Sequence, residues 1–233
     1  MKAASRLVLA ALALTFAAVA GPVAAAEIES SIARGGRLYD RWWSENKAPK
    51  PDEAHPAYPA NGKYAKQSWR CKECHGWDLK GKDGAYGSGT HATGIKGLTG
   101  AAGKDPAAIA AVIKDKTHGY TDAMLSAQDV TDLANFISKG QFDPARYIDA
   151  ATSKPKGDPA KGEAYFNTLC AGCHGKDGKK VSTGVALGVA AENPLEMLWK
   201  AMHGQPGEAM PALRVLDASV AADVVAYTQS LPK

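Results

Sequence analysis

Two five-residue stretches contain all four cysteines of the chain, and their residue types could do redox chemistry. They read Cys71-Lys72-Glu73-Cys74-His75 and Cys170-Ala171-Gly172-Cys173-His174. In this order, two thiols can form thioether bonds with the vinyl groups of a porphyrin, and the adjacent histidine then lies under the iron as its proximal ligand. The spacing predicts two covalently attached haem c groups, bound by Cys71, Cys74, His75, Cys170, Cys173 and His174.

Redox dithiols, disulfides and zinc ribbons also use Cys-x-x-Cys pairs. The two pairs of a zinc ribbon usually lie about 15 to 20 residues apart, whereas a far longer stretch separates Cys74 from Cys170. None of these chemistries requires a histidine after each pair, and the chain has only 6 histidines. The haem interpretation is therefore the stronger one.

At these motifs the chain resembles the two-domain dihaem members of the class I c-type cytochromes, over about residues 30 to 233. The resemblance is strong at the haem motifs and weaker between them. It implies a mostly α fold of two tandem cytochrome c-like domains, each a small helical fold wrapped around one covalently bound haem. It also implies that the first helix of each domain crosses the last one.

Residues 1–26 have the pattern of a secretory signal peptide. Lys2 and Arg6 precede an apolar run from Leu7 to Val19, and Ala24-Ala25-Ala26 predicts cleavage before Glu27. The apolar run is shorter than the roughly 20 residues that span a bilayer, so we expect no membrane span in the mature chain. Because bacterial haem c is attached outside the cytoplasmic membrane, the resemblance implies a periplasmic protein.

The charges of the chain are nearly balanced. There are 28 basic and 24 acidic residues, and two of the basic ones lie in the predicted signal peptide. This balance gives no case for a nucleic-acid partner or an anionic membrane surface.

Repeated elements predict the domain boundaries. We expect domain 1 at residues 27–148, a linker at 149–159 and domain 2 at 160–233. Gly162-Glu163-Ala164-Tyr165 matches Gly36-Arg37-Leu38-Tyr39 in the opening helices. Domain 1 alone carries a Pro-rich insertion at about 43–68, which predicts an irregular loop that either contacts a partner or covers the first haem.

Later elements also match in pairs. Asp105-Pro106 and Asn193-Pro194 each read as an N-cap followed by proline at the first helical position. Both of these helices are expected to run into a His-Gly pair, at His118 and His203. Ser126 and Asp217 are the expected caps of the final helices.

The sixth iron ligand decides whether a haem carries electrons or does chemistry. In domain 2 the candidate is Met210, because Met-Pro after the third helix is the usual distal ligand of the family and a thioether is a soft ligand. The family also places a proline whose carbonyl holds the proximal histidine. Neither half has that proline, although another backbone carbonyl could orient His75 or His174.

The sequence indicates the distal ligand of the first haem less directly. Met124 looks like the counterpart of Met210, but it lies only 2 residues before Ser126, and two extended residues span about 7 Å. That reach is too short to connect the iron to the final helix, so we favour His118, with Met124 next and His91 as the remaining alternative. The predicted metal ligands are therefore His75, His118, His174 and Met210.

These features favour an electron carrier rather than an enzyme. We expect a periplasmic dihaem cytochrome that takes electrons from a dehydrogenase and passes them to another cytochrome or a terminal oxidase. Two alternatives stay open. One is an oxidoreductase acting at the first haem, of the peroxidase or sulfur-compound dehydrogenase type, although no fifth cysteine exists to ligate iron as in the thiosulfate enzymes. The other is an electron-transfer subunit bound to a larger dehydrogenase.

Overall fold

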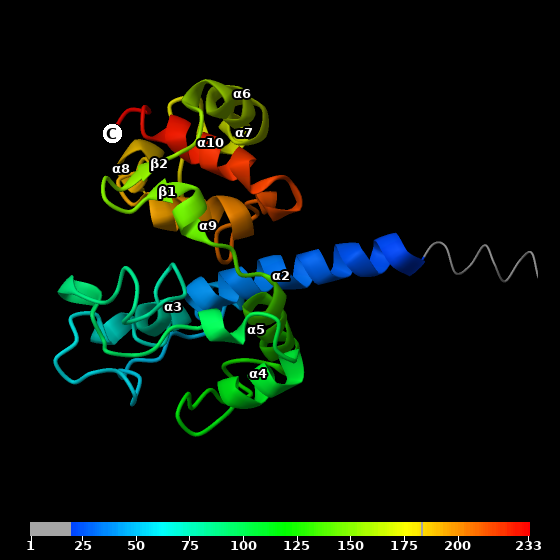
Figure 1. Ribbon diagram of the computed structural model, residues 1–233, viewed down its shortest axis with the longest axis vertical. Coiled ribbons are helices and arrows are strands. Elements are labelled where there is room, and N and C mark those ends of the chain that lie inside the picture. The colour runs from blue at the N-terminus through cyan, green and yellow to red at the C-terminus, as the bar shows by residue number, and fades with distance from the viewer. Residues whose placement is uncertain (1–19, 183) are drawn as a thin grey trace, which may run out of the picture.

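The computed structural model describes residues 20–182 and 184–233, so the apolar part of the predicted signal peptide lies outside the described residues. The described chain is mostly helical, with nine α-helices and two strands of two residues each, in agreement with the expected mostly α fold. In the same residues, no helix is long and apolar enough to cross a membrane. The helices form two groups, which Figure 1 shows one above the other.

The first group is built on two long helices that cross. Helix α2 (Ala20–Glu45) packs against α5 (Ala127–Lys139), with α3 (Cys71–His75) and α4 (Pro106–Ile113) beside them (Figure 1). A Cβ atom at Gly35 would collide with the carbonyl of Asp132, so glycine permits the crossing. Tyr39 and Phe136 are fully buried at this contact, with ring centres 5.5 Å apart.

The second group repeats this crossing with shorter helices. Helix α6 (Pro159–Leu169) packs against α10 (Ala218–Thr228), and α7 (Ala171–His174), α8 (Leu187–Ala190) and α9 (Pro194–His203) complete the group. A Cβ atom at Gly162 would collide with the carbonyl of Asp223. Gly162 therefore corresponds to Gly35, and the fully buried Phe166 corresponds to Tyr39. The expected match of Gly162 with Gly36 was wrong by one residue, because it aligned Tyr39 with Tyr165, whereas the residue buried in the place of Tyr39 is Phe166.

The predicted helix starts are confirmed. Asp105 and Asn193 accept hydrogen bonds from the first turns of α4 and α9, each with proline at the next position. Ser126 forms a capping box with Asp129, and Asp217 caps α10. The prediction that both third helices run into a histidine holds for α9 only, since α4 ends at Ile113, before His118.

The remaining described chain is irregular, apart from short elements. Residues 46–64 of the insertion contain no helix or strand. The boundary between the expected domain 1 and the expected linker contains an antiparallel pair, β1 (Ile148–Asp149) with β2 (Lys154–Pro155), in which Ile148 is paired with Pro155. The five 3-10 helices are Ala65–Gln67, Gly89–His91, Thr99–Ala101, Pro144–Arg146 and Leu213–Val215.

The two groups meet where α9 packs on α2. The Trp199 indole nitrogen donates a 3.1 Å hydrogen bond to the carbonyl of Gly36. Beside it, the fully buried Asp40 forms ion pairs with Lys200 of α9 and with Arg70, which precedes the first motif. A charged contact therefore links the second group to the residues flanking the first Cys-x-x-Cys-His motif.

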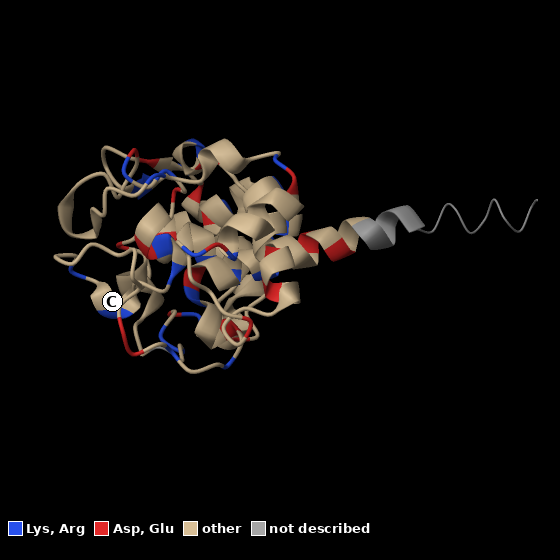
Figure 2. Ribbon diagram, turned by 90° about the horizontal axis from the view of Figure 1, so that it is seen from below, with Lys and Arg blue, Asp and Glu red and all other residues tan. Residues whose placement is uncertain are grey.

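Along the ribbon, basic and acidic residues are interspersed (Figure 2). This distribution agrees with the near-neutral balance of the sequence.

Candidate haem-binding sites

The first motif forms α3, a single short helix that ends at His75 and is followed by the C-cap residue Gly76. Gly76 adopts φ 77°, which favours glycine, and its carbonyl accepts a 2.6 Å hydrogen bond from the Tyr39 hydroxyl. Neither thiol of the motif is in a disulfide. Burial raises the pKa of Cys71 to about 11 and that of Cys74 to about 12, so both are protonated thiols at neutral pH in the haem-free chain.

His75 is held in one orientation by a backbone carbonyl. Its Nδ1 donates to the carbonyl oxygen of Lys96 over 2.8 Å, because a carbonyl can only accept. Burial lowers the pKa of His75 to about 4, so the ring is neutral at neutral pH. A neutral imidazole with Nδ1–H occupied offers Nε2 as a metal ligand. The expectation that another carbonyl replaces the proline carbonyl is confirmed for His75.

His118 is the histidine that faces His75. Their ring centres are 6.4 Å apart, with 29° between the ring planes. The Nδ1 atom of His118 lies 3.0 Å from a carboxylate oxygen of Asp115, which also accepts the backbone N–H groups of Thr117 and His118. The carboxylate fixes this ring and leaves its Nε2 free, as Lys96 does for His75.

This geometry fits a single iron between the two rings. A bond from a metal to an imidazole nitrogen is about 2 Å long, and the ring centre lies roughly 1 Å beyond the nitrogen, so two imidazoles on opposite sides of one metal have centres about 6 Å apart. The 6.4 Å separation matches that spacing. Within residues 20–182 and 184–233, no group of three or more His, Cys, Asp or Glu side chains is arranged to hold a metal ion.

The other candidates for the first haem lie elsewhere. His91 is stacked between the rings of Tyr64 and Tyr86, at 4.1 and 4.5 Å, and its Nδ1 lies 3.3 Å from Glu73. Met124 packs against the hydrophobic core of the first group. Of the three candidates weighed from sequence, the described structure therefore places His118 opposite His75.

The second motif is more open to solvent. Cys173 is exposed, and burial raises the pKa of the partly buried Cys170 to about 11. As in the first motif, the glycine after the histidine has a positive φ, 74° at Gly175. The Nδ1 atom of His174 is buried and, among the described residues, makes no hydrogen bond of ordinary geometry. Burial lowers the pKa of His174, and the neighbouring Lys180 backbone opposes this shift only partly.

Met210 is half-buried in the segment that follows α9, with its carbonyl beside Gly204. His203, the other histidine of a His-Gly pair, is fully buried against Gly36 and Phe136. Burial lowers the pKa of His203 to about 3, so it is a neutral packing residue between the two groups. The two His-Gly pairs therefore have different environments, and the pairing of Met210 with His174 stays a prediction.

Three contributors to these sites were missed from sequence. The carboxylate of Asp115 could have been suspected from its position three residues before His118, a spacing typical of side-chain bonds to the backbone. The Lys96 carbonyl gives no sequence signal, because every residue has one. The buried Asp40 also gives none, since its partners Arg70 and Lys200 are distant in the chain.

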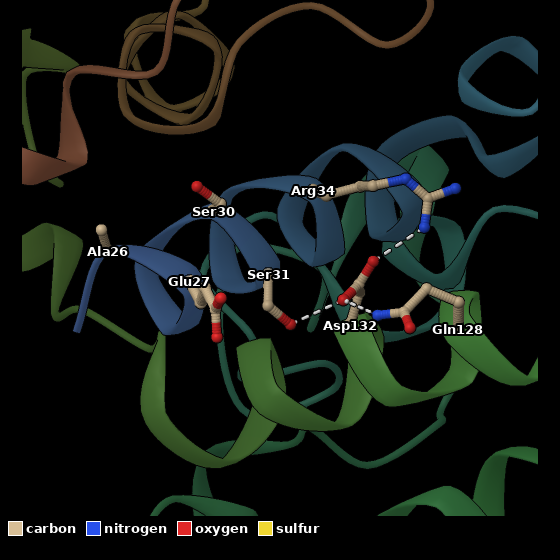
Figure 3. A pocket seen from close by; sticks show the side chains of 7 residues that line it. All are labelled: Ala26, Glu27, Ser30, Ser31, Arg34, Gln128 and Asp132. Atoms are coloured by element: carbon tan, nitrogen blue, oxygen red, sulfur yellow. Dashed lines mark hydrogen bonds and ion pairs between the residues drawn. The ribbon is translucent and has the colours of Figure 1, made fainter. Parts of the chain in front are cut away.

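An open pocket at the start of α2 is separate from both motifs. Figure 3 shows Arg34 and Ser31 converging on Asp132 of α5, with bonds of 2.7 and 2.6 Å, and Gln128 bonding the same carboxylate. Its lining residues are Ala26, Glu27, Ser30, Ser31, Arg34, Gln128 and Asp132. None of them belongs to a Cys-x-x-Cys-His motif, so we assign the pocket no part in haem binding.

Comparison with known families supports a c-type cytochrome. Residues 157–227 match the family model described as cytochrome c oxidase, cbb3-type, subunit III. This match covers the second group and its motif, and it implies a covalently bound haem c with an electron-transfer role there. No curated protein and no solved structure matches the chain.

Proposed function

We propose that the protein is a dihaem c-type cytochrome that carries electrons in the periplasm. Residues 27–148 and 160–233 would each form one haem domain, with the secretory signal at 1–26 removed. The observation that carries this proposal is the pair of facing imidazoles, His75 and His118, whose ring centres are 6.4 Å apart and whose Nδ1 atoms are both hydrogen-bonded to the protein. The same motif and the same positive-φ glycine in the second group support a second haem of the same kind.

Each cysteine and histidine of the two motifs and each distal ligand would have a separate role in holding the haems. Cys71 and Cys74 hold the first haem and Cys170 and Cys173 hold the second, with His75 and His174 as proximal ligands. His118 and Met210 complete the two iron coordination spheres. The bound iron supplies one-electron oxidation and reduction. Filled axial positions favour electron transfer, because no site on the iron is left for a substrate.

Different distal ligands would give the electrons a direction. Methionine ligation raises the reduction potential of a haem relative to bis-histidine ligation. Electrons would therefore enter at the first haem from a periplasmic dehydrogenase. They would leave from the second haem to another cytochrome or a terminal oxidase.

The test is an optical and electron paramagnetic resonance spectrum of the purified holoprotein, oxidised and reduced, with and without carbon monoxide. We expect two low-spin haems, one bis-histidine and one histidine-methionine, neither of which binds carbon monoxide. A high-spin or carbon-monoxide-binding first haem would overturn the carrier assignment and favour an oxidoreductase with an open iron.

A matched pair of variants assigns the ligand. His118→Ala should convert the first haem to a form that binds carbon monoxide. His91→Phe, which changes the stacked histidine beside Glu73, should leave the spectrum unchanged. The reverse result would make His91 the distal ligand.

A further inference from the structure

The insertion of the first group is fastened to the segment that carries His118. His55, near the middle of the insertion, is buried with only 6% of its surface exposed. Its Nε2 atom lies 2.7 Å from the backbone carbonyl oxygen of His118. This contact joins residues 63 positions apart in the chain.

The tautomer of His55 follows from its other ring nitrogen. The backbone N–H of Ala57 donates to Nδ1 over 3.1 Å, so Nδ1 carries no proton. The proton of the neutral ring must then be on Nε2, which donates it to the carbonyl of His118. Both ring nitrogens therefore form hydrogen bonds only in the tautomer that carries its proton on Nε2.

Further contacts hold His55 itself in place. Its backbone N–H donates to the Ser68 hydroxyl over 2.8 Å, and that hydroxyl donates to the Ala65 carbonyl. The imidazole packs edge-on against Trp69, with ring centres 4.4 Å apart, and the Trp69 indole nitrogen donates to the carbonyl of Glu53. The support of His55 thus comes from residues directly preceding Cys71.

Apart from His55, the segment around His118 is held by bonds within the segment and by the buried Tyr120, whose hydroxyl donates to the Trp69 carbonyl over 3.0 Å. α4 ends at Ile113, and Gly119 adopts φ 65° directly after the histidine. The His118 side chain is 30% exposed, and its Asp115 partner is 42% exposed. The Asp115 carboxylate orients the ring and accepts the backbone N–H of His118, but it belongs to the same exposed segment and does not tie that segment to the rest of the fold.

From this geometry we propose that His55 is a positioning residue, through which the insertion fixes the backbone of His118 so that its imidazole stays opposite His75. The inference rests on the proposed function, and it assigns the insertion a role inside the protein rather than at a partner surface. When this hydrogen bond is absent, the His118 segment can move away and leave the sixth position of the first haem open part of the time.

The experiment compares three holoprotein variants by the fraction of haem that binds carbon monoxide in the reduced state. His55→Leu keeps a similar apolar volume but removes the donor, and we expect a roughly 5- to 30-fold rise in that fraction, at the first haem only. His55→Gln can donate to the same carbonyl, so it should restore the value found with histidine. His91→Phe serves as the control histidine outside this contact and should have no effect.

The outcomes separate this inference from the proposed function. If most of the first haem in the unsubstituted protein already binds carbon monoxide, the proposed ligation fails. If it does not, and His55→Leu also remains inert, the ligation stands and the role of His55 is wrong. A loss of signal from both haems in His55→Leu, with no rescue by glutamine, would show general destabilisation and also overturn the positioning role.

A second variant covers the case in which His55→Leu does not fold. Ser68→Ala removes the hydroxyl that holds the His55 backbone and leaves the imidazole intact. We expect a smaller rise in carbon monoxide binding at the first haem, with the second haem unchanged. No rise in this variant, when it folds and carries both haems, would contradict the proposal.

Discussion

The two Cys-x-x-Cys-His regions share a local backbone but differ in what surrounds it. His75 has a carbonyl partner for Nδ1 and a second histidine opposite it, whereas Nδ1 of His174 is buried without a hydrogen bond among the described residues. The first region is surrounded by a large aromatic core with many tryptophans and tyrosines. Beside the second motif, the buried cluster consists of Phe166, Val224 and Leu231. The first site is therefore preorganised by the protein, and the second depends more on its haem.

The strongest test of this comparison removes the attachment cysteines of each proposed haem in turn. Cys71→Ala with Cys74→Ala, and separately Cys170→Ala with Cys173→Ala, should each halve the covalent haem content. The first group has its own core and should keep most of its helix, whereas the second should lose much of its helix because a porphyrin would supply much of its interior. Haem content and far-ultraviolet circular dichroism measure this. Equal loss of helix in both variants would contradict the contrast.

The second prediction concerns the distal ligand of the second haem. Met210→His should lower the reduction potential of this haem by on the order of 0.1 V, because histidine replaces a ligand that raises the potential. A spectroscopic redox titration checks the shift, with the first haem as internal reference. Met197→Leu, a change at a residue packed in the core of the second group, is the control and should leave both potentials in place.

The third prediction tests the contact between the two groups. Burial acts to raise the pKa of Asp40, but Lys200 and Arg70 outweigh it and hold that pKa below its usual value. Asp40→Asn leaves the buried Lys200 without its carboxylate partner and Arg70 with Glu73 alone, and it should lower the free energy of unfolding by about 3–5 kcal/mol. Denaturant unfolding measures the loss. Lys82→Met, in the exposed pair with Asp83, should change it by less than about 0.5 kcal/mol.

The sign of the pH dependence follows from the same carboxylate. The pKa of Asp40 is lower in the folded than in the unfolded chain, so the unfolded chain binds more protons at acid pH. The stabilisation is complete above about pH 4 and is lost as the pH falls through the lower, folded pKa. Asp40→Asn should remove this part of the acid sensitivity. An unchanged acid transition in the variant would show that Asp40 does not contribute to it.

The smallest expected effect comes from the carboxylate beside His118. Asp115→Asn weakens the acceptor of the Nδ1 proton and makes the imidazole a poorer donor to oxidised iron, so the potential of the first haem should rise by tens of millivolts. The potential of the second haem should not move. Asp122→Asn changes another exposed carboxylate in the same segment and is the control. A fall in potential, or an equal rise in both variants, would argue against this role of Asp115.

The sequence by itself determined the parts that depend on neighbouring residues. Each Cys-x-x-Cys-His motif identifies a haem-attachment site from five consecutive residues. The helix caps act within one turn of helix, and they are Asp105, Asn193, Ser126 and Asp217. Proline within the insertion likewise predicted an irregular segment, and residues 46–64 are irregular.

Only the tertiary structure decided which distant groups meet. The short reach between Met124 and Ser126 favoured His118 but could not separate it firmly from Met124 or His91, because the fold of a loop depends on what it packs against. For the same reason, the sequence could not predict the contact of His75 with the Lys96 carbonyl, the hydrogen bond from His55 to His118 or the ion pairs of Asp40. The sequence shows which side chains can bind haem iron, and the packing of distant segments decides which of them face each other.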